Sequence, residues 1–119
     1  MLLVDTNIIA YFFNGDINAG NLIAQNEIAI SAITYTEILS NKNLNKEQRL
    51  LVHDFLNTIF ICHTNAEITE TAISYCLSYN IKPMDAIILA TAKFLNTSIA
   101  TADKKLFKIK EVTILKLNP

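Results

Sequence analysis

The sequence predicts an α/β fold: a three-layer α/β/α sandwich around a parallel sheet of four to five strands. Three observations predict it. Short apolar runs alternate with segments of helical periodicity along the chain. The short runs are continuously apolar, as is typical of strands covered on both faces. Strands separated by helices connect in parallel, which places helices on both faces of the sheet.

The first part of the chain predicts two strands and two helices. Residues 2–4 are an apolar strand, and residues 28–30 are a second one. The segments 7–13 and 17–26 between them have helical character. The pair Asn14-Gly15 separates the two helices, because these residue types favour turns.

The middle of the chain continues the alternation. Residues 33–41 and 46–58 predict two helices, and the second has apolar residues near helical spacing. Residues 59–62 are an apolar third strand. Residues 65–79 then form a long helix with one apolar stripe, which we expect to face the sheet.

The last part of the chain predicts one more helix and two more strands. Residues 84–95 form a helix that is apolar almost all round, and such a helix is expected to be central and buried. Residues 98–101 are the fourth strand. Residues 112–115 are a fifth strand, which is short and expected at an edge of the sheet.

The composition bounds the class of protein. A chain of 119 residues has the size of one domain, so residues 1–119 are expected to form a single domain. Hydrophobic residues make up 51% and charged residues 18%, which excludes a disordered chain. No apolar stretch approaches the ~20 residues that span a membrane, and the N-terminus does not resemble a signal peptide. We therefore expect a cytoplasmic protein without a membrane partner.

The net charge excludes a protein that binds nucleic acid by overall charge alone, and the spacing of cysteines and histidines excludes a zinc site. With a formal net charge of −1, the chain cannot hold nucleic acid by overall charge alone, so such a partner needs a local patch or metal ions. The cysteines and histidines lack zinc-site spacing. Half of the ten basic residues gather late in the chain, which taken alone indicates a solvated face: Lys104, Lys105, Lys108, Lys110 and Lys116.

Four carboxylates are expected to meet at one end of the sheet. Asp5 follows the first strand, and Asp103 follows the fourth. Glu37 lies in the helix after the second strand, and Asp85 opens the apolar helix. In open α/β sheets, ligands bind at the carboxyl ends of the strands, so this edge is where chemistry is expected.

Each of these acids has a simpler structural interpretation. Asp5 and Asp103 fit helix N-caps, and Glu37 with Thr34 fits a capping box. Asp85, two residues after a proline, suits the positive end of a helix. Together, however, four converging carboxylates repel one another and raise one another's pKa. A divalent metal ion removes that penalty, since Mg²⁺ and Mn²⁺ prefer carboxylate oxygens. An all-carboxylate site favours metal-assisted phosphodiester hydrolysis.

Four segments of the chain resemble the signature blocks of the PIN-domain ribonucleases, and the resemblance runs from residue 2 to about residue 107. The blocks are Val4-Asp5-Thr6-Asn7, Ser31-x-x-Thr34-x-x-Glu37, Pro83-Met84-Asp85-Ala86-Ile87-Ile88-Leu89-Ala90-Thr91-Ala92 and Thr101-Ala102-Asp103. A short chain made of this domain alone resembles the VapC-type toxins of bacterial toxin–antitoxin pairs. The resemblance implies a single PIN-like nuclease domain that cleaves RNA with Mg²⁺ or Mn²⁺.

The resemblance also implies roles for individual residues. Asp5, Glu37, Asp85 and Asp103 would form the acidic, metal-binding site, with Asp5 and Asp85 as the direct ligands. Thr6 and Asn7 would orient Asp5 or a metal-bound water, and Thr101 would hydrogen-bond within the site. In one respect the chain departs from the family. Many relatives carry another polar or acidic residue before the Phe that follows the last block, and here Lys104-Lys105-Leu106 stands before Phe107.

The first helix suggests a contact with another chain. Residues 8–13 are apolar on every side, and exposed aromatic side chains usually mark interfaces. The alternative is that the following helix, residues 17–26, covers this surface completely. The family resemblance implies a homodimer and a cognate antitoxin, whose tail covers the acidic pocket with an Arg or Lys.

Two non-catalytic functions compete with this interpretation. The length and alternation also suit a receiver-like signalling module, but Cys62-His63-Thr64 stands where the phosphoacceptor Asp should follow the third strand. A catalytically inactive PIN-like interaction domain is the other alternative. A haloacid-dehalogenase-like phosphatase would need a second Asp where Asn7 stands.

Overall fold

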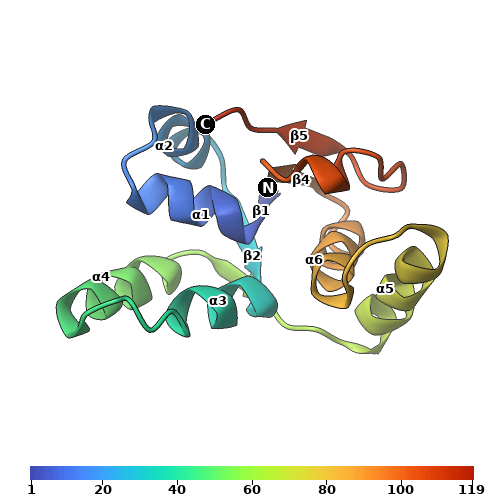
Figure 1. Cartoon of the computed structure of the whole chain (residues 1–119), viewed down its shortest axis with the longest axis horizontal. Coiled ribbons are helices and arrows are strands. Elements are labelled where there is room, and N and C mark those ends of the chain that lie inside the picture. Colours follow the sequence, from blue (N-terminus) through green and yellow to red (C-terminus); the bar gives the residue numbers. More distant parts are fainter.

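The five strands form one parallel sheet in the order β3-β2-β1-β4-β5, of which Figure 1 labels β2, β1, β4 and β5. This computed structural model describes residues 1–119. The strands are β1 (Leu2–Val4), β2 (Ile28–Ser31), β3 (Phe60–Cys62), β4 (Ser98–Thr101) and β5 (Ile114–Lys116). Every neighbouring pair is parallel, as the sequence predicts.

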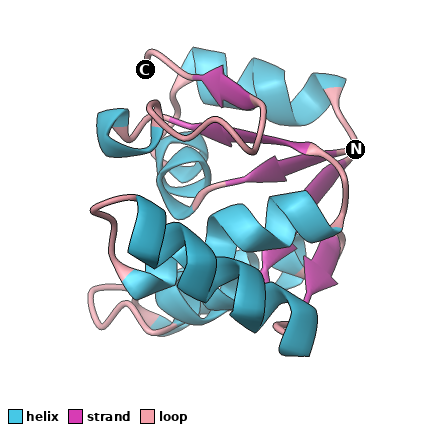
Figure 2. Cartoon of the chain, turned by 90° about the vertical axis from the view of Figure 1, so that its right-hand side faces the viewer, coloured by secondary structure: helices cyan, strands magenta, loops and turns pink.

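Helices cover both faces of the sheet, so the predicted three-layer architecture is confirmed (Figure 2). On one face, α5 and α6 pack with the 3₁₀ helix η1, and on the other, α1, α2, α3 and α4 pack. The helices are α1 (Thr6–Phe13), α2 (Ile17–Gln25), α3 (Ala32–Leu39), α4 (Lys46–Leu56), α5 (Ala66–Ser78), α6 (Pro83–Phe94) and η1 (Lys104–Leu106). None of them has the length and apolar character needed to cross a bilayer.

Alternate residues of the central strands feed two separate cores. Leu3 of β1 lies in the core with α5 and α6, whereas its neighbours Leu2 and Val4 lie in the core with α1, α2 and α4. This is the two-residue period of a strand, and both faces of β1 are buried. Continuous apolar runs in the sequence therefore correspond to strands covered on both sides.

The predicted elements are all present, with small differences at their ends. The fifth strand begins at Ile114 rather than at residue 112, because Val112 is buried in the core beside α6 instead of pairing. The helix α6 is central and buried as predicted, although Met84 and Phe94 near its ends are exposed. The sequence did not predict η1, a single turn at residues 104–106.

The helices α3 and α4 form an arm that lies on one side of the sheet (Figure 1). Arg49, the only arginine of the chain, stabilises the turn between α3 and α4. The Arg49 guanidinium donates to the carbonyl of Leu39, to that of Asn41 at 3.0 Å and to that of Leu44 at 3.4 Å. The Leu39 carbonyl belongs to the last residue of α3 and the other two to the turn after it, where backbone acceptors lack helical partners. Arg49 thus has a structural role in the fold.

The aromatic surface of α1 is only partly covered. Phe12 and Phe13 pack against Phe55 of α4, with ring centroids 5.0 and 5.4 Å from that of Phe55. Phe13 nevertheless keeps 41% of its surface exposed. The alternative that α2 covers this surface completely is therefore wrong, and α4 rather than α2 supplies the aromatic contact.

Candidate active site

The candidate site lies at the carboxyl ends of β1 and β4. The chain runs from β1 outward to β2 and β3, and it returns to β4 on the other side of β1. The strand order therefore reverses between β1 and β4, and ligands of open α/β sheets bind in the crevice at such a reversal. Asp5 stands directly after β1, and its amide donates to the carbonyl of Ala100 in β4 at 2.9 Å. Asp5 is thereby fixed at the reversal point.

The Asp5 carboxyl group is buried and held by two hydrogen bonds. One oxygen accepts from the amide of Thr6 at 2.8 Å, and the other accepts from the hydroxyl of Thr101 at 2.7 Å. Only 5% of the residue is exposed. Asp5 is also the N-cap of α1, so the capping interpretation of this residue is confirmed. Each oxygen keeps lone-pair capacity for a further partner.

The surroundings of Asp5 disfavour its charge. Burial is the main cause that raises the pKa of Asp5, and the negative charges of Asp85 and Asp103 raise it further. The hydrogen bonds from Thr101 and Thr6 act in the opposite direction. The net shift is upward. A buried acid with two acidic neighbours is a typical place for a cation to bind.

Asp85 and Asp103 line a cavity of about 540 Å³, and both are near enough to Asp5 for their charges to affect it. Burial raises the pKa of Asp85, and the charge of Asp103 adds to this, whereas Lys82 and Lys105 lower it. The Asp85 carboxylate takes part in no hydrogen bond of the chain and is free to accept one. Asp103 caps η1, because its carboxylate accepts from the amide of Lys105 at 3.0 Å.

Glu37 approaches the site from α3, and its partner is Thr6. The Thr6 hydroxyl lies 3.1 Å from the Glu37 carboxylate, to which it donates, and 3.0 Å from the hydroxyl of Thr34. The N-cap of α3 is Ser31, so Glu37 stands beyond the first turn of the helix. The capping-box interpretation of Thr34 and Glu37 is therefore wrong. Glu37 thus contacts the residue that directly follows Asp5 in the chain.

The remaining predicted residue, Asn7, contacts the neighbouring loop rather than Asp5. Its side-chain oxygen accepts from the amide of Ala102 at 3.3 Å. The next amide, that of Asp103, donates to the Thr101 hydroxyl at 3.0 Å. Asn7 and Thr101 together fix the loop that carries Asp103 against β1.

The chemistry of the donor set suits a hard divalent cation. Asp5, Asp85 and Asp103 present only carboxylate oxygens, which Mg²⁺ and Mn²⁺ prefer. The charges of Asp85 and Asp103 are close enough to raise the pKa of Asp5, and the charge of Asp103 also raises the pKa of Asp85. In their present positions, however, no three acidic, histidine or cysteine side chains are grouped tightly enough to hold an ion. Side-chain adjustment would be needed to bring them together around one.

Sequence reasoning missed two basic residues at the site. Lys82 and Lys105 line the same cavity as Asp85 and Asp103. Lys105 belongs to the late lysine run, and Lys82 directly precedes the Pro83 block. The closeness of these lysines to Asp85 and Asp103 along the sequence was the only signal available. It does not reveal which lysines face the cavity.

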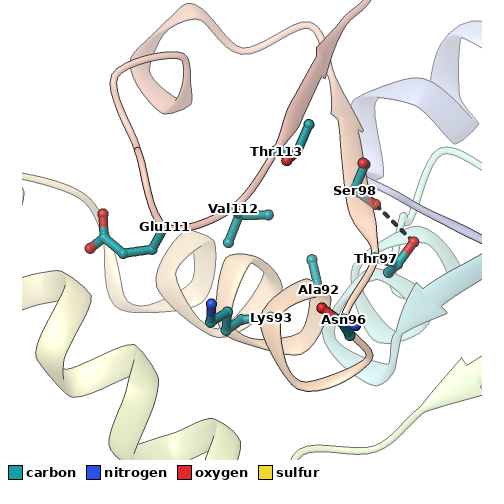
Figure 3. Close-up of a pocket in the computed structure, with 8 residues that line it drawn as sticks. All are labelled: Ala92, Lys93, Asn96, Thr97, Ser98, Glu111, Val112 and Thr113. Atoms are coloured by element: carbon teal, nitrogen blue, oxygen red, sulfur yellow. Dashed lines mark hydrogen bonds between the residues drawn. The ribbon is translucent and has the colours of Figure 1, made fainter.

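A second pocket lies away from these residues, at the opposite end of β4 (Figure 3). It has a volume of about 290 Å³ and is lined by residues that include Lys93 of α6, Ser98 at the start of β4 and Glu111. β4 runs from Ser98 to Thr101, and only Thr101 is at the site. This pocket therefore has no part in the acidic site.

The order and geometry of these blocks agree with a comparison to protein families. Residues 2–112 match the PIN domain family. The chain belongs to the PIN domain family. This match extends from β1 to the loop before β5 and includes all four acidic residues. It excludes the receiver-like alternative, because the chain has the PIN arrangement throughout.

Solved structures of similar fold include toxin–antitoxin complexes and a toxin. A toxin–antitoxin complex from Klebsiella pneumoniae is 29% identical, with a TM-score of 0.85 over 95% of this chain and 96% of that one. VapBC2 from Rickettsia felis, bound to a promoter DNA fragment, is 27% identical, with a TM-score of 0.81 over 98% of each chain. The toxin VapC20 of Mycobacterium tuberculosis, which cleaves the sarcin–ricin loop, is 17% identical, with a TM-score of 0.72 over 95% of this chain and 99% of that one. No curated protein matches the chain by sequence.

Proposed function

We propose that this PIN domain is a VapC-type toxin, an endoribonuclease that hydrolyses RNA phosphodiester bonds with Mg²⁺ or Mn²⁺. One observation carries the proposal. Asp5 is buried at the strand reversal with two acidic neighbours, an arrangement that raises its pKa and that a divalent cation would relieve. The similarity to toxin–antitoxin structures supports the toxin class, and the similarity to a toxin that cleaves the sarcin–ricin loop supports the choice of RNA as substrate.

The residues of the site would divide the work between holding the ion and orienting the ligands. Asp5 and Asp85 would bind it directly, and Asp103 and Glu37 would complete the acidic set. When bound, such an ion supplies positive charge for the phosphate and lowers the pKa of water. Thr101 fixes the orientation of Asp5, and Thr6 fixes that of Glu37. The pairing of these two acids with hydroxyl donors limits their motion while leaving lone pairs for metal.

Two protein partners belong to the same proposal. A cognate antitoxin would cover the acidic cavity with a basic side chain and lie along the partly exposed surface of Phe12 and Phe13. A second copy of the chain would form a homodimer. The structure offers apolar side chains for this on α5, where Leu77 is 85% exposed and Ile73 is 49% exposed. Both side chains line one cavity on α5 and α6, and contiguous exposed apolar surface marks interaction sites.

A cleavage assay with matched variants tests the enzyme function. Purified protein and a labelled RNA are incubated with Mg²⁺, with Mn²⁺ or with EDTA. We expect cleavage with either metal, none with EDTA, and a loss of about 10²-fold or more in Asp85→Asn. The control is Asp54→Asn, which removes one exposed carboxylate from α4. Cleavage that persists in EDTA and in Asp85→Asn contradicts the proposal. Absence of cleavage with either metal supports the alternative of an inactive PIN domain.

A further inference from the structure

Lys82 and Lys105 line the acidic cavity, and neither forms an ion pair with a carboxylate. Lys82, Asp85, Asp103 and Lys105 line one cavity of about 540 Å³. Both lysines are exposed. The only ion pair within 4.0 Å in the chain joins His53 and Asp54, so neither ammonium group is paired with a carboxylate. The two charges are therefore available to a ligand that enters the cavity.

The backbones of both lysines are held beside the acids. Lys82 is the N-cap of α6, with extended backbone angles (φ −72°, ψ 147°), as the following proline requires. Asp85 lies three residues later in the first turn. The Lys105 amide donates to the Asp103 carboxylate at 3.0 Å. The positive charge of each lysine also lowers the pKa of Asp85, which is consistent with this proximity.

Lys105 differs from other lysines of the late run. Lys116 lies over the ring of Phe107, with 5.0 Å between its ammonium nitrogen and the ring centroid. Of the five late lysines, only Lys105 lines the acidic cavity. A lysine run that is merely a solvated face gives no reason for one member to share a cavity with Lys82 and two carboxylates. This placement indicates a role at the site.

We propose that Lys82 and Lys105 form a phosphate-binding subsite that holds the RNA backbone in the acidic cavity. The inference deepens the proposed ribonuclease function and rests on it. Polynucleotide phosphates would otherwise be repelled by Asp85 and Asp103 in a chain with a net charge of −1. An ammonium group acts as a point charge toward phosphate, so the subsite gives affinity without sequence preference.

The salt dependence of RNA binding tests the subsite directly. A fluorescently labelled single-stranded RNA is titrated with the protein in EDTA, which prevents cleavage, at several NaCl concentrations. Each phosphate contact contributes about 0.7 to the slope of log K against log [NaCl]. We expect Lys82→Gln and Lys105→Gln each to weaken binding several-fold and to reduce the slope by about 0.7. Lys82→Arg should retain the wild-type slope, because it keeps the charge.

The matched control is Lys93→Gln, which changes the same residue type at the other end of α6, away from the acids. It should leave the slope unchanged. Unchanged slopes in Lys82→Gln and Lys105→Gln overturn the subsite, as does an equal loss in all three variants or a wild type that binds no RNA. A parallel cleavage assay with Mg²⁺ separates the two proposals. If the wild type binds RNA through these lysines but does not cleave it, the subsite proposal holds and the ribonuclease proposal is wrong. If the wild type cleaves RNA but the lysine variants leave the slope unaltered, the ribonuclease proposal holds and the subsite proposal is wrong.

Discussion

The hydroxyl of Thr101 donates a 2.7 Å hydrogen bond to the buried carboxyl group of Asp5, a residue 96 positions away in the chain. The same hydroxyl accepts from the amide of Asp103 at 3.0 Å. One side chain thus links the acid after β1 to the loop that carries the acid after β4. Because Thr101 is fully buried, water cannot replace either hydrogen bond.

Replacement of Thr101 by Val should destabilise the protein and impair the site. Val keeps the shape of the side chain but leaves one oxygen of the Asp5 carboxyl group and the Asp103 amide each without a partner. A buried group left unsatisfied costs about 1–3 kcal/mol. We expect the free energy of unfolding, measured in urea, to fall by this amount. The pKa of Asp5 should rise further, since Thr101 lowers it, and the pH–rate profile should move to higher pH. Thr101→Ser retains the hydroxyl and should remain close to wild type.

The raised pKa of Asp5 predicts how stability depends on pH in the absence of metal. Its pKa is higher in the folded than in the unfolded chain, so the folded state binds the proton more tightly. The charged carboxylate then destabilises the fold at neutral pH, and this cost disappears as the pH falls through the raised pKa. The metal-free protein should gain Tm on mild acidification, and Mg²⁺ at neutral pH should give a similar gain.

The variant Asp5→Asn isolates this effect. Asn has the same shape and is a good N-cap, so α1 should remain capped. At neutral pH without metal, we expect a Tm several degrees above wild type, because ~1 kcal/mol corresponds to about 4–8 °C in a domain near this size. The gain on acidification should shrink, and RNA cleavage should be lost. A Tm below wild type at neutral pH, with an unchanged response to acid, would show that the charge of Asp5 is not the cause.

Substitution of Glu37 by Gln separates a site role from a structural role. Glu37 is exposed and does not cap α3, so its carboxylate contributes little to the fold. As a site residue held by Thr6, it should lose about 10²-fold in cleavage rate when neutralised. Initial rates at saturating Mg²⁺ and a thermal melt give the two readouts. Glu70→Gln, an exposed change on α5, is the control and should alter neither. Near wild-type turnover in Glu37→Gln would remove Glu37 from the site.

The sequence predicted the layers of the fold, and the reason is physical. The role of the four acids in a site stays a prediction. Apolar runs and helical periods record burial, and the end of a parallel strand such as 2–4 marks the edge where ligands bind. The hydrogen bond between Thr101 and Asp5 was not predictable from spacing alone, since it requires β4 to lie beside β1. Strand order leaves no local trace in the sequence. The same limit applies to Lys105, whose run looks like an ordinary charged surface.

The pattern around Glu37 shows a different limit. Thr34 and Glu37 have the spacing of a capping box, but Ser31 caps α3 instead, by accepting from the amide of Ile33 at 3.0 Å. Ser31 and Thr34 could each be the N-cap of α3, and the residue at which the helix begins decides which of them is. Helix ends are the least certain part of a pattern-based prediction, so the cap could not be assigned from the sequence. The cytoplasmic location stays a prediction.

Self-association should depend on the exposed apolar side chains of α5. Leu77 is 85% exposed, and with Ile73 it borders an apolar cavity of about 320 Å³ between α5 and α6. Burial of such a side chain stabilises a complex by about 1.5–3 kcal/mol. We expect a dimer mass by light scattering at micromolar concentration, and a monomer in Leu77→Ser. Phe13→Ser on α1 should leave the mass unchanged. A wild type that is strictly monomeric, or a dimer that survives Leu77→Ser, contradicts this prediction.

Binding of a cognate antitoxin should compete with the divalent metal. A basic side chain from the antitoxin tail would sit among Asp5, Asp85 and Asp103, where it would offset the same negative charge that the metal offsets. The partner to test is the product of a small reading frame immediately upstream of the gene. We expect its dissociation constant to rise with excess Mg²⁺, compared with NaCl of equal ionic strength, which corrects for screening.

The variant Asp85→Asn locates the competition. It should bind the antitoxin more weakly than wild type and show a smaller response to Mg²⁺, because one of the shared carboxylates is gone. Phe13→Ser should also weaken binding, through the aromatic surface of α1, but it should leave the Mg²⁺ response intact since it lies outside the acidic set. If Mg²⁺ leaves the affinity of the wild type unchanged while Phe13→Ser reduces it, the antitoxin inhibits from the α1 surface and does not occupy the acidic cavity.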